Sequence, residues 1–400
     1  MKIEKDMQAQ LCAGFMAAFE ETPVRFFSAP GRTEIGGNHT DHQRGRVLAG
    51  AVNLDTVAAV RPNGTGTIRV QSKGYPMSVV DLNSLTPVES EKNTTPSLIR
   101  GVAARFAQLG CKVEGFDAYV ESTVLPGSGL SSSAAFEVLI GTIINCMFFE
   151  KTLTQPEIAM VAQYAENVFF GKPCGLMDQM ASAVGGMVTI DFADKEHPVI
   201  DPVEFDFAAC GHALCIIDSG ADHADLTDEY AAITEEFKGL CAYFGKEVLT
   251  QVAEEDFYRC IPALRQQCGD RAVMRGIHEY EENKRVVKQV EALRKGDFDA
   301  FLKLIKESGY SSYMYLQNVI PAGYIAHQDV AVALGLCAHF LKDRGAYRVH
   351  GGGFAGTVQA FVPYDLLENF RKGIAAVLGE GACHVLSIRP HGGVEAYAQA

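Results

Sequence analysis

The stretch Leu125-Pro-Gly-Ser-Gly-Leu-Ser-Ser-Ser-Ala134 decides how this chain is interpreted. It follows a short run with strand character, residues 117–123, and precedes an apolar helical pattern at residues 134–149. A glycine- and serine-rich loop that opens a helix directs several backbone N–H groups at one point, where the helix dipole adds positive potential. The sequence therefore predicts a phosphate site, with the hydroxyls of its three consecutive serines as oxygen donors suited to Mg²⁺.

Two commoner nucleotide-binding loops do not fit this stretch. The pattern G-x-x-x-x-G-K-[ST] needs a lysine before the hydroxyl residue, and G-x-G-x-x-G needs a third glycine where Ser132 stands. The alternative is a plain linker whose serine caps the following helix. Three further segments of the chain argue for the phosphate site.

Composition and charge describe a folded, acidic protein and exclude several other classes. Four hundred residues exceed the usual size of one core, so we expect two domains, 1–200 and 201–400, joined near the acidic, proline-containing residues 194–206. The net charge of −14, without a basic run, argues against nucleic-acid binding. No apolar run approaches membrane-spanning length, so we expect no membrane partner.

The eleven cysteines are scattered and form no C-x-x-C pair, so the sequence predicts neither a zinc site nor a disulfide framework. Their odd number fits a reducing compartment. Residues 1–15 lack the basic start and apolar centre of a signal peptide. We therefore expect a cytoplasmic protein.

Hydrophobic periodicity predicts a mixture of helices and strands, and hence an α+β fold. Strands are expected at residues 24–28, 47–60, 67–72, 77–81, 117–123, 187–192, 215–218, 346–349, 357–362 and 384–388. Helices are expected at residues 3–20, 97–109, 134–149 and 156–170, from 178 onward, over much of 225–342, and at 364–378. Residues 30–45, between the first two strands, are expected to form a polar loop.

The second segment, Ser28-Ala-Pro-Gly-Arg-Thr-Glu-Ile-Gly-Gly-Asn-His-Thr-Asp-His42, places an arginine, a glutamate, an aspartate and two histidines behind a Pro-Gly turn. Arg32 is a fixed charge whose fork geometry suits a phosphate or a carboxylate. His39 and Asp41 together suit sugar hydroxyls. A solvated turn is the alternative for any one of these residues, but the density of mixed donors and acceptors favours a pocket for a polar ligand.

The third segment runs from Glu166 to Gly175-Leu-Met-Asp178-Gln179. Glu166 lies near the end of its predicted helix, where a carboxylate opposes the helix dipole unless it faces solvent or a cation. A cation ligand is therefore the functional interpretation of Glu166, and a surface glutamate is the alternative. Asp178 lies where the next helix begins, so a helix N-cap is its alternative role.

The fourth segment, Arg348-Val-His-Gly-Gly-Gly-Phe-Ala-Gly356, has four glycines within six residues. Such a run between a strand and an apolar stretch lets the backbone approach a ligand closely. A tight turn is the alternative, although a turn rarely needs so many glycines.

These segments resemble the motifs of a family of small-molecule kinases that includes galactokinase, homoserine kinase, mevalonate kinase and phosphomevalonate kinase. The loop at 125–134 resembles the family's second motif, and residues 351–356 resemble its third. Within the family, residues 31–42 are similar to the galactokinase signature G-R-V-N-L-I-G-E-H-T-D-Y. Residues 173–179 and Asp228-Glu229-Tyr230 are similar to galactokinase as well, and the motifs occur in the family's order.

The resemblance implies a two-domain kinase fold with the active site in the cleft between domains, and ATP- and Mg²⁺-dependent phosphorylation of the anomeric hydroxyl of a galactose-type sugar. It implies that Asp178 faces that hydroxyl and that Arg32 stabilises the transferring phosphoryl group, which makes both catalytic. The other implied roles are Mg²⁺ ligands for Ser133 and Glu166, ATP contacts for Gly127, Gly129, Ser131, Ser132, Gly352 and Gly353, and sugar contacts for Asn38, His39, Asp41 and Tyr230.

Three positions depart from the galactokinase pattern. Asn38 stands in the place of a glutamate that would hold the sugar's 6-hydroxyl, His42 replaces a tyrosine, and His350 replaces a small hydroxyl residue. A glutamate would repel a 6-carboxylate, whereas Asn38 and His42 could hydrogen-bond to one. Galacturonate is therefore an alternative acceptor, and residues 39–43 also resemble galacturonate kinases of this family.

Two other functions stay open from the sequence. Relatives that only sense galactose and ATP, and regulate transcription through a partner, have a shortened serine loop, whereas the loop of this chain is intact. A kinase for a non-sugar alcohol is the other alternative, and the cluster of His39 and Asp41 argues against it. The expected partners are a sugar and ATP, and the family implies a monomer.

Overall fold

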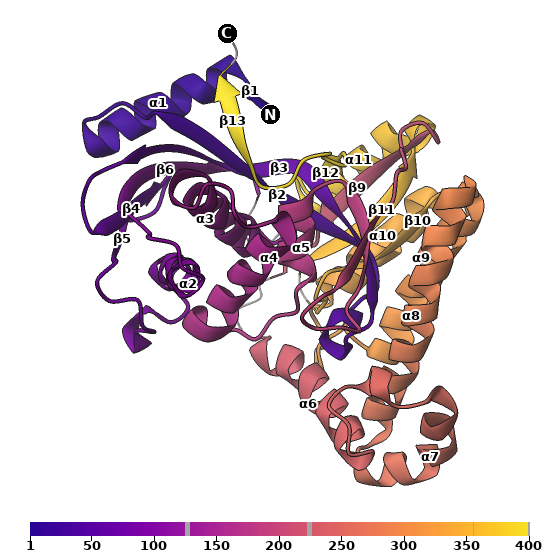
Figure 1. The fold of residues 1–400 in the computed structure, drawn as a ribbon. Coiled ribbons are helices and arrows are strands. Elements are labelled where there is room, and N and C mark those ends of the chain that lie inside the picture. The colour runs from indigo at the N-terminus through magenta and orange to yellow at the C-terminus, as the bar shows by residue number, and fades with distance from the viewer. Residues whose placement is uncertain (125–128, 222–225, 355, 399–400) are drawn as a thin grey trace.

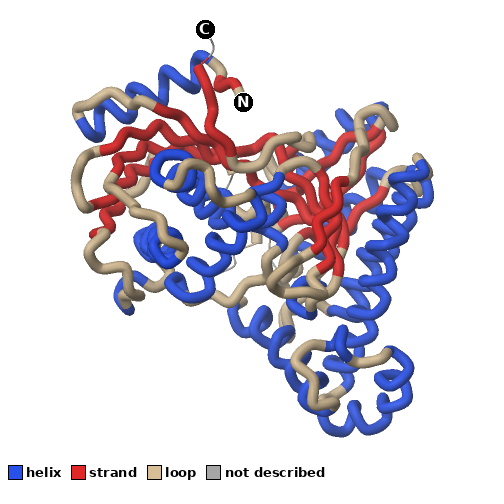
Figure 2. Tube along the Cα trace, viewed as in Figure 1, coloured by secondary structure: helices blue, strands red, loops and turns tan. Residues whose placement is uncertain are grey.

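The computed structural model describes residues 1–124, 129–221, 226–354 and 356–398. Within these ranges the chain forms two β-sheets, each packed against helices, and a helical projection that contains α6 (Thr227–Tyr243) and α7 (Glu254–Gln267) (Figure 1). The strands gather in two groups surrounded by helices, as Figure 2 shows. The predicted α+β class is confirmed.

The large sheet has the strand order β1-β13-β2-β3-β6-β4-β5, with β7 pairing with β3 and β8 pairing with β7. Its strands are β1 (Lys2–Ile3), β2 (Arg25–Gly36), β3 (Arg46–Pro62), β4 (Thr67–Ser72), β5 (Ser78–Asp81), β6 (Phe116–Ser122), β7 (Met187–Asp191), β8 (Val199–Pro202) and β13 (Val394–Ala398). The helices on its faces are α1 (Lys5–Phe19), α2 (Thr95–Gln108), α3 (Ser132–Phe148), α4 (Gln155–Tyr164) and α5 (Met177–Val184).

Alternation of side chains along β3 explains why this sheet is covered on both faces. Ala58 and Val60 belong to the core shared with α2, α3, α4 and α5, whereas Val57 and Ala59 belong to a smaller core formed with α1. Successive residues of a strand point to opposite faces, so an apolar run is stable only when helices cover both. Figure 1 shows α1 and the α2–α5 group on opposite sides of the sheet.

The small sheet has the order β10-β11-β9-β12 and is antiparallel throughout. Its elements are β9 (His212–Asp218), β10 (Ala346–His350), β11 (Thr357–Pro363) and β12 (Cys383–Leu386), with α8 (Asp270–Lys295), α9 (Phe298–Ser311), α10 (Asp329–Leu341) and α11 (Tyr364–Leu378) around them. Cys215 and Ile217 of β9 face α10 and α11, whereas Leu214 and Ile216 share a core with Leu48 of β3. That shared core joins the two sheets.

Five short helical segments complete the described chain. Three are 3₁₀ segments, η1 (Thr40–Gln43), η2 (Glu89–Glu91) and η4 (Leu249–Gln251), and two are π-helical, η3 (Ala165–Phe170) and η5 (Ser312–Leu316). The π-helical η3 ends the helix predicted at 156–170, and Glu166 lies in it. π-Segments place side chains out of register with the preceding α-helix and occur often at functional sites.

The polar loop predicted at 30–45 is wrong over its first half, because β2 continues through Pro30 to Gly36. This part of β2 pairs with β3, with register irregularities between Pro30 and Arg32 and between Glu34 and Gly36. Polar residues alone would not sustain a strand, but backbone pairing with β3 does, and the irregularities re-aim side chains locally. The segment is therefore held rigidly.

The division into domains 1–200 and 201–400 stays a prediction, and two strands bear on it. β8 spans the proposed boundary and pairs with β7, and β13 returns to the large sheet, where Val394 lies opposite Ser28 of β2. Among the described residues, no helix combines the length and apolar character needed to cross a membrane.

Candidate active site

An ion pair between Arg32 and Asp178 lies at the centre of the predicted site. Arg32 Nε donates to Asp178 Oδ1 at 2.7 Å and Arg32 Nη2 donates to Asp178 Oδ2 at 2.8 Å, so both carboxylate oxygens are engaged by the fork. Arg32 is buried, whereas the Asp178 side chain is 30% exposed. The carboxylate therefore has a fixed orientation and an accessible side.

Ser131 joins this pair from the start of α3. Its hydroxyl donates to Asp178 Oδ2 at 2.6 Å, and Arg32 Nη1 donates to the carbonyl of Gly129. Ser131 is at the N-cap position, but its hydroxyl makes no cap bond to the helix and its φ of 59° is left-handed. Ser131 therefore occupies the N-cap position without using its hydroxyl as a cap, and the helix N-terminus keeps backbone donors for an anion.

Asp178 likewise is no helix cap. It lies in the first turn of α5, whose cap residue Leu176 precedes it by two positions and makes no side-chain cap bond. Burial alone would raise the pKa of Asp178, but the charge and hydrogen bonds of Arg32, with the bond from Ser131, outweigh it and hold the pKa below its ordinary value. The carboxylate is therefore ionised at neutral pH.

Glu166 lies beside Ser133, as the metal-ligand prediction requires. Glu166 is 3% exposed, so the surface alternative is wrong, and Ser133 Oγ is 3.5 Å from Glu166 Oε1. Lys172 Nζ lies 3.8 Å from the same oxygen. Burial raises the pKa of Glu166, with Lys172 opposing the rise. The described residues contain no cluster of three His, Cys, Asp or Glu side chains able to hold a metal by themselves.

Glu137 is a buried carboxylate near this position that sequence reasoning missed. Gln179 Nε2 donates to Glu166 Oε2 at 2.7 Å and to Glu137 Oε2 at 3.2 Å, so one amide joins the two carboxylates. The other oxygen of Glu137 and the amide oxygen of Gln179 are buried without a partner among the described atoms. Burial and the charge of Glu166 raise the pKa of Glu137 well above its ordinary value.

The donor set fits Mg²⁺ bound together with a nucleotide. Ser133 and Glu166 offer oxygen donors only, and Mg²⁺ is usually held by one or two protein oxygens, with phosphates and water completing its shell. Two buried oxygens there, Glu137 Oε1 and Gln179 Oε1, have no partner among the described atoms, and a cation bound nearby would interact favourably with them. The spacing of Ser133 and Glu137, one helical turn apart on α3, could have indicated Glu137.

His39 and Asp41 lie on the loop that follows β2. A Cβ atom on Gly175 would lie 1.7 Å from Asp41 Oδ2, so this carboxylate packs directly against the loop that leads to α5. His39 Nε2 donates to the carbonyl of Gly352 at 3.0 Å. Burial, together with the charge of His42, lowers the pKa of His39 to about 3, so its imidazole is neutral and Nδ1 is an acceptor.

Tyr230 and the glycine-rich fourth segment lie on the other side of these residues. Tyr230 Oη donates to the carbonyl of Gly353 at 2.7 Å, and a Cβ atom on Gly352 would lie 2.7 Å from the Tyr230 ring. Gly353 has a φ of 80°, and a Cβ there would lie 2.0 Å from the carbonyl oxygen of Asn318. The tight-turn alternative does not explain such close approach, since the segment is enclosed by side chains from α6 and from the loop after η5.

His350 connects the serine loop with β2. His350 Nε2 accepts from the backbone N–H of Glu34 at 3.1 Å, so the proton is on Nδ1, which lies 2.9 Å from Thr357 Oγ1. Burial and the charges of Arg32 and Arg348 lower the pKa of His350 well below its ordinary value. Gly129 has a φ of 68°, and a Cβ there would lie 2.5 Å from Thr357 Oγ1 and 3.2 Å from His350 Nδ1, so this position favours glycine.

Asn38 is placed differently from the other predicted sugar contacts. It is fully buried, and its side-chain amide bonds to Glu34, Gly351, Ser312 and Asn318. Asn38 thus remains a predicted substrate contact, but its amide could bind a sugar only by exchanging one of these protein partners.

Contacts join Arg32, Asp178, Ser131 and Gly129 in one set, Ser133 and Glu166 in a second, and Asn38, His39, Tyr230, Gly352 and Gly353 in a third. Asp41 packs against Gly175. Two predicted residues are outside these contacts. Gly127 lies outside the described residues. Ser132, in the first turn of α3, is half-buried beside the linked residues.

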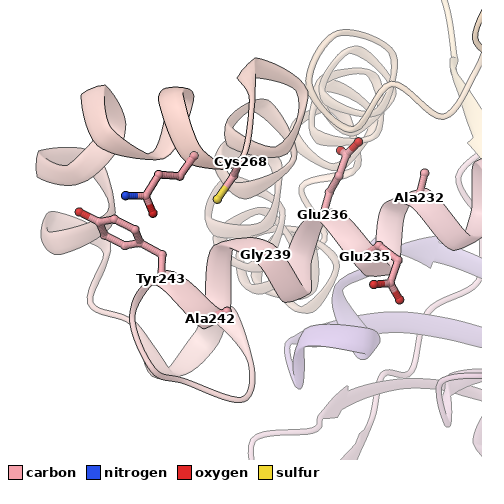
Figure 3. Close-up of a pocket in the computed structure, with 8 residues that line it drawn as sticks. Ala232, Glu235, Glu236, Gly239, Ala242, Tyr243 and Cys268 are labelled. Atoms are coloured by element: carbon pink, nitrogen blue, oxygen red, sulfur yellow. The ribbon is translucent and has the colours of Figure 1, made fainter.

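A hollow of about 630 Å³ on the helical projection, lined by Glu235, Glu236, Tyr243 and Cys268 among others, contains none of the predicted residues (Figure 3).

Two family models match parts of the chain. Residues 97–186 match the N-terminal domain of GHMP kinases, the family of galactokinase, homoserine kinase, mevalonate kinase and phosphomevalonate kinase. Residues 13–62 match the galactokinase galactose-binding signature. The first match includes the serine loop and Asp178, and the second includes Arg32 and Asp41.

Solved structures of such kinases share the fold over nearly the whole chain. Lactococcus lactis galactokinase, solved with galactose, has a TM-score of 0.82 at 22% identity, covering 97% of this chain and 99% of its own. Mevalonate kinase of Methanococcus jannaschii has a TM-score of 0.63 at 14% identity, covering 92% and 98%. Streptococcus pneumoniae phosphomevalonate kinase, solved with phosphomevalonate and AMPPNP, has a TM-score of 0.62 at 12% identity, covering 91% and 100%. On this shared fold, the two matched stretches are similar to the N-terminal domain of GHMP kinases and to the galactose-binding signature of galactokinase.

Proposed function

We propose that this protein transfers the γ-phosphoryl group of ATP to the anomeric hydroxyl of a galactose-type sugar and releases the sugar 1-phosphate and ADP. The observation on which the proposal depends is the bidentate pair of Arg32 and Asp178, joined by Ser131 at the start of α3. It brings a carboxylate, a guanidinium and a helix N-terminus together, which are the parts that phosphoryl transfer needs.

Each of these parts has a distinct task in the transfer. The sugar oxygen forms a bond to the γ-phosphorus while the bond from that phosphorus to the bridging oxygen of ADP breaks. The proton of the sugar hydroxyl passes to Asp178, which is ionised because its pKa is held low. Arg32 and the N–H groups at the start of α3 offset the charge on the transferring group. A low pKa makes Asp178 a weak base, so proton transfer late in the reaction suits it best.

Ser133 and Glu166 would hold Mg²⁺ in this proposal. The ion would supply positive charge that offsets part of the phosphate charge. Gln179 keeps Glu166 in a single orientation through its 2.7 Å hydrogen bond, and Gln179 follows Asp178 directly in the chain. The residue that orients Glu166 and the carboxylate that faces the sugar therefore lie on the same turn of α5.

The acceptor is a hexose of the galactose series in this proposal, and galactose is preferred to galacturonate. His39, Asp41 and Tyr230 offer the acceptors and donors for the sugar hydroxyls. His42 stacks on His39 with ring centroids 5.8 Å apart, and its side chain is 36% exposed. His42 is therefore the residue of this loop that would meet a 6-carboxylate, and it keeps galacturonate as the second acceptor to test.

A coupled assay of ADP release tests the proposal. Galactose, galacturonate, N-acetylgalactosamine and arabinose are supplied in turn with ATP and Mg²⁺, and mevalonate and homoserine serve as non-sugar acceptors. We expect turnover with galactose, and we expect the product to be identified as the sugar 1-phosphate. Turnover with only a non-sugar alcohol, or binding of ATP and galactose without any ADP formation, would replace this proposal by one of the two alternatives.

A further inference from the structure

The carbonyl groups of three consecutive glycines, 351–353, all accept hydrogen bonds from side chains. The donors are Asn38 Nδ2 to Gly351 at 2.6 Å, His39 Nε2 and Asn318 Nδ2 to Gly352 at 3.0 and 3.2 Å, and Tyr230 Oη to Gly353 at 2.7 Å. Glycine backbones are intrinsically the most mobile, so a run of three keeps one conformation only when its polar groups are bound.

Asn38 makes the shortest of these bonds, and all donors and acceptors of its side chain are hydrogen-bonded within the protein. Its Nδ2 also donates to Glu34 Oε1 at 3.0 Å, its Oδ1 accepts from Asn318 Nδ2 at 2.8 Å and Ser312 Oγ at 3.1 Å, and its backbone carbonyl accepts from His278 Nε2 at 2.9 Å. An amide group offers two donors and two acceptor positions, and all four are used here.

Glu34 fixes which way the Asn38 amide points. A carboxylate accepts only, so the NH₂ group of Asn38 must face Glu34, and Glu34 is itself paired with the buried Arg348. In the galactokinase signature quoted above, asparagine occupies the position of Glu34 and glutamate the position of Asn38. The two residue types are exchanged in this chain, and the pair still contains one carboxylate and one amide.

We infer that Asn38 is a positioning residue that holds the glycine segment 351–353 against the loop at 37–42, and that it does not select the substituent on carbon 6 of the sugar. The inference rests on the proposed function only in assigning that segment to the nucleotide side of the site. Because the exchanged pair keeps its carboxylate, position 38 gives no reason to prefer a 6-carboxylate substrate.

Nucleotide binding without turnover is the main test. Asn38→Ala should weaken the binding of ADP or a non-hydrolysable ATP analogue, measured by calorimetry, by about tenfold, because the glycine segment loses its shortest bond. The affinity for galactose alone should change less than about threefold. Asn283→Ala is the matched control, since Asn283 is bonded to Arg46 and Glu279 and to none of the glycines 351–353, and the nucleotide affinity of this variant should equal that of the wild type.

A second variant keeps the test valid if Asn38→Ala does not fold. Asn318→Ala removes the neighbouring donor to Gly352 and should weaken nucleotide binding in the same way. The double variant should lose less than the sum of the two single changes, because both residues act on one segment. Strictly additive effects, or nucleotide affinities equal to that of the wild type in folded variants, would overturn the inference.

The substitution Asn38→Glu distinguishes the positioning role of Asn38 from a contact with carbon 6 of the sugar. Asn38→Glu places a second carboxylate beside Glu34 and removes the donor to Gly351, so we expect weaker nucleotide binding and an unchanged ratio of kcat/KM for galactose over galacturonate. A tenfold shift of that ratio toward galactose, with normal nucleotide affinity, would show that position 38 faces carbon 6. If the wild-type protein binds nucleotide but phosphorylates no sugar, the proposed function fails while the nucleotide measurements still decide the inference.

Discussion

Arg32 and Asp178 are 146 positions apart in the chain, and yet they form a bidentate pair. The segment around Arg32 predicted a pocket for a polar ligand, whereas an aspartate at the start of a helix is by itself typical of an N-cap, and the resemblance alone implied a catalytic role for Asp178. Their contact could not be predicted from spacing, since it depends on how β2 and α5 pack. The resemblance to kinase motifs supplied that link.

At the level of single residues, Asp178→Ala should abolish most of the activity. We expect kcat to fall by about 10²- to 10⁴-fold, the usual contribution of a positioned base, with nucleotide affinity largely kept. Steady-state kinetics and calorimetry measure the two quantities. The control is Asp191→Ala, which removes an ion pair with the half-exposed Arg46 and should leave kcat unchanged. A near-normal rate for Asp178→Ala would show that the catalytic assignment is wrong.

The protonation of His39 gives a second prediction. Burial favours the neutral imidazole, so its pKa moves from its ordinary value near 6.5 down to about 3. A free histidine is protonated on acidification to pH 5, whereas His39 stays neutral, so its hydrogen bond to Gly352 persists. The NMR signal of the His39 ring, assigned by its loss in His39→Gln, should stay constant between pH 5 and 8. A midpoint near 6.5 would contradict this.

Glu137→Gln tests the buried carboxylate that the sequence did not reveal. Glutamine keeps one oxygen that can accept from Gln179, but it cannot carry a negative charge beside Glu166, so we expect the affinity for Mn²⁺ with bound nucleotide to fall by about tenfold or more. Electron paramagnetic resonance of Mn²⁺ measures it without turnover. Glu121→Gln, which removes an ion pair with the exposed Lys73, is the matched control. Unchanged Mn²⁺ affinity with a lower melting temperature would assign Glu137 a structural role only.

At the level of elements, most helices and strands followed from periodicity, and the exceptions have physical reasons. The polar half of β2 has no apolar alternation, and only pairing with β3 makes it a strand. The π-helical η3 covers six residues, which is too short for hydrophobic periodicity to distinguish its i→i+5 hydrogen bonding from that of an α-helix. β13 was not predicted, and it belongs to the large sheet only because the chain returns there after the small sheet, which local periodicity does not reveal.

The packing of η1 against the loop before α5 predicts the effect of Gly175→Ala. The new methyl group would lie 1.7 Å from Asp41 Oδ2, so the carboxylate must move. We expect KM for the sugar to rise about tenfold or more, equivalent to about 1.4 kcal/mol, with unchanged nucleotide affinity. The matched control is Gly335→Ala in α10, where a Cβ meets no atom within 4 Å, and it should leave both quantities unchanged. An unchanged sugar KM in Gly175→Ala would exclude Asp41 as a sugar contact.

At the level of the whole molecule, β13 is needed for the sheet that bears Arg32. It pairs with β1 on one side and with β2 on the other, and Glu395 pairs with Arg25 at 2.7 Å. Removal of residues 394–400 should lower the melting temperature by at least about 5 °C, because β2 loses its neighbour and the α1 core is opened. Glu395→Gln, which removes only the ion pair, should cost less than about 1 kcal/mol. Equal melting temperatures for truncated and full chains would contradict this.

The return of β13 also has a consequence for how the protein is made. On a ribosome the residues of β2 and β3 emerge early, whereas their outer neighbour emerges only after residue 394 has been added. Until then β2 has a bare edge on which a foreign strand could add. The nascent chain is thus exposed to mispairing for almost the whole time of its synthesis. We therefore expect the yield of folded protein to depend on chaperones more than the stability of the native state would suggest.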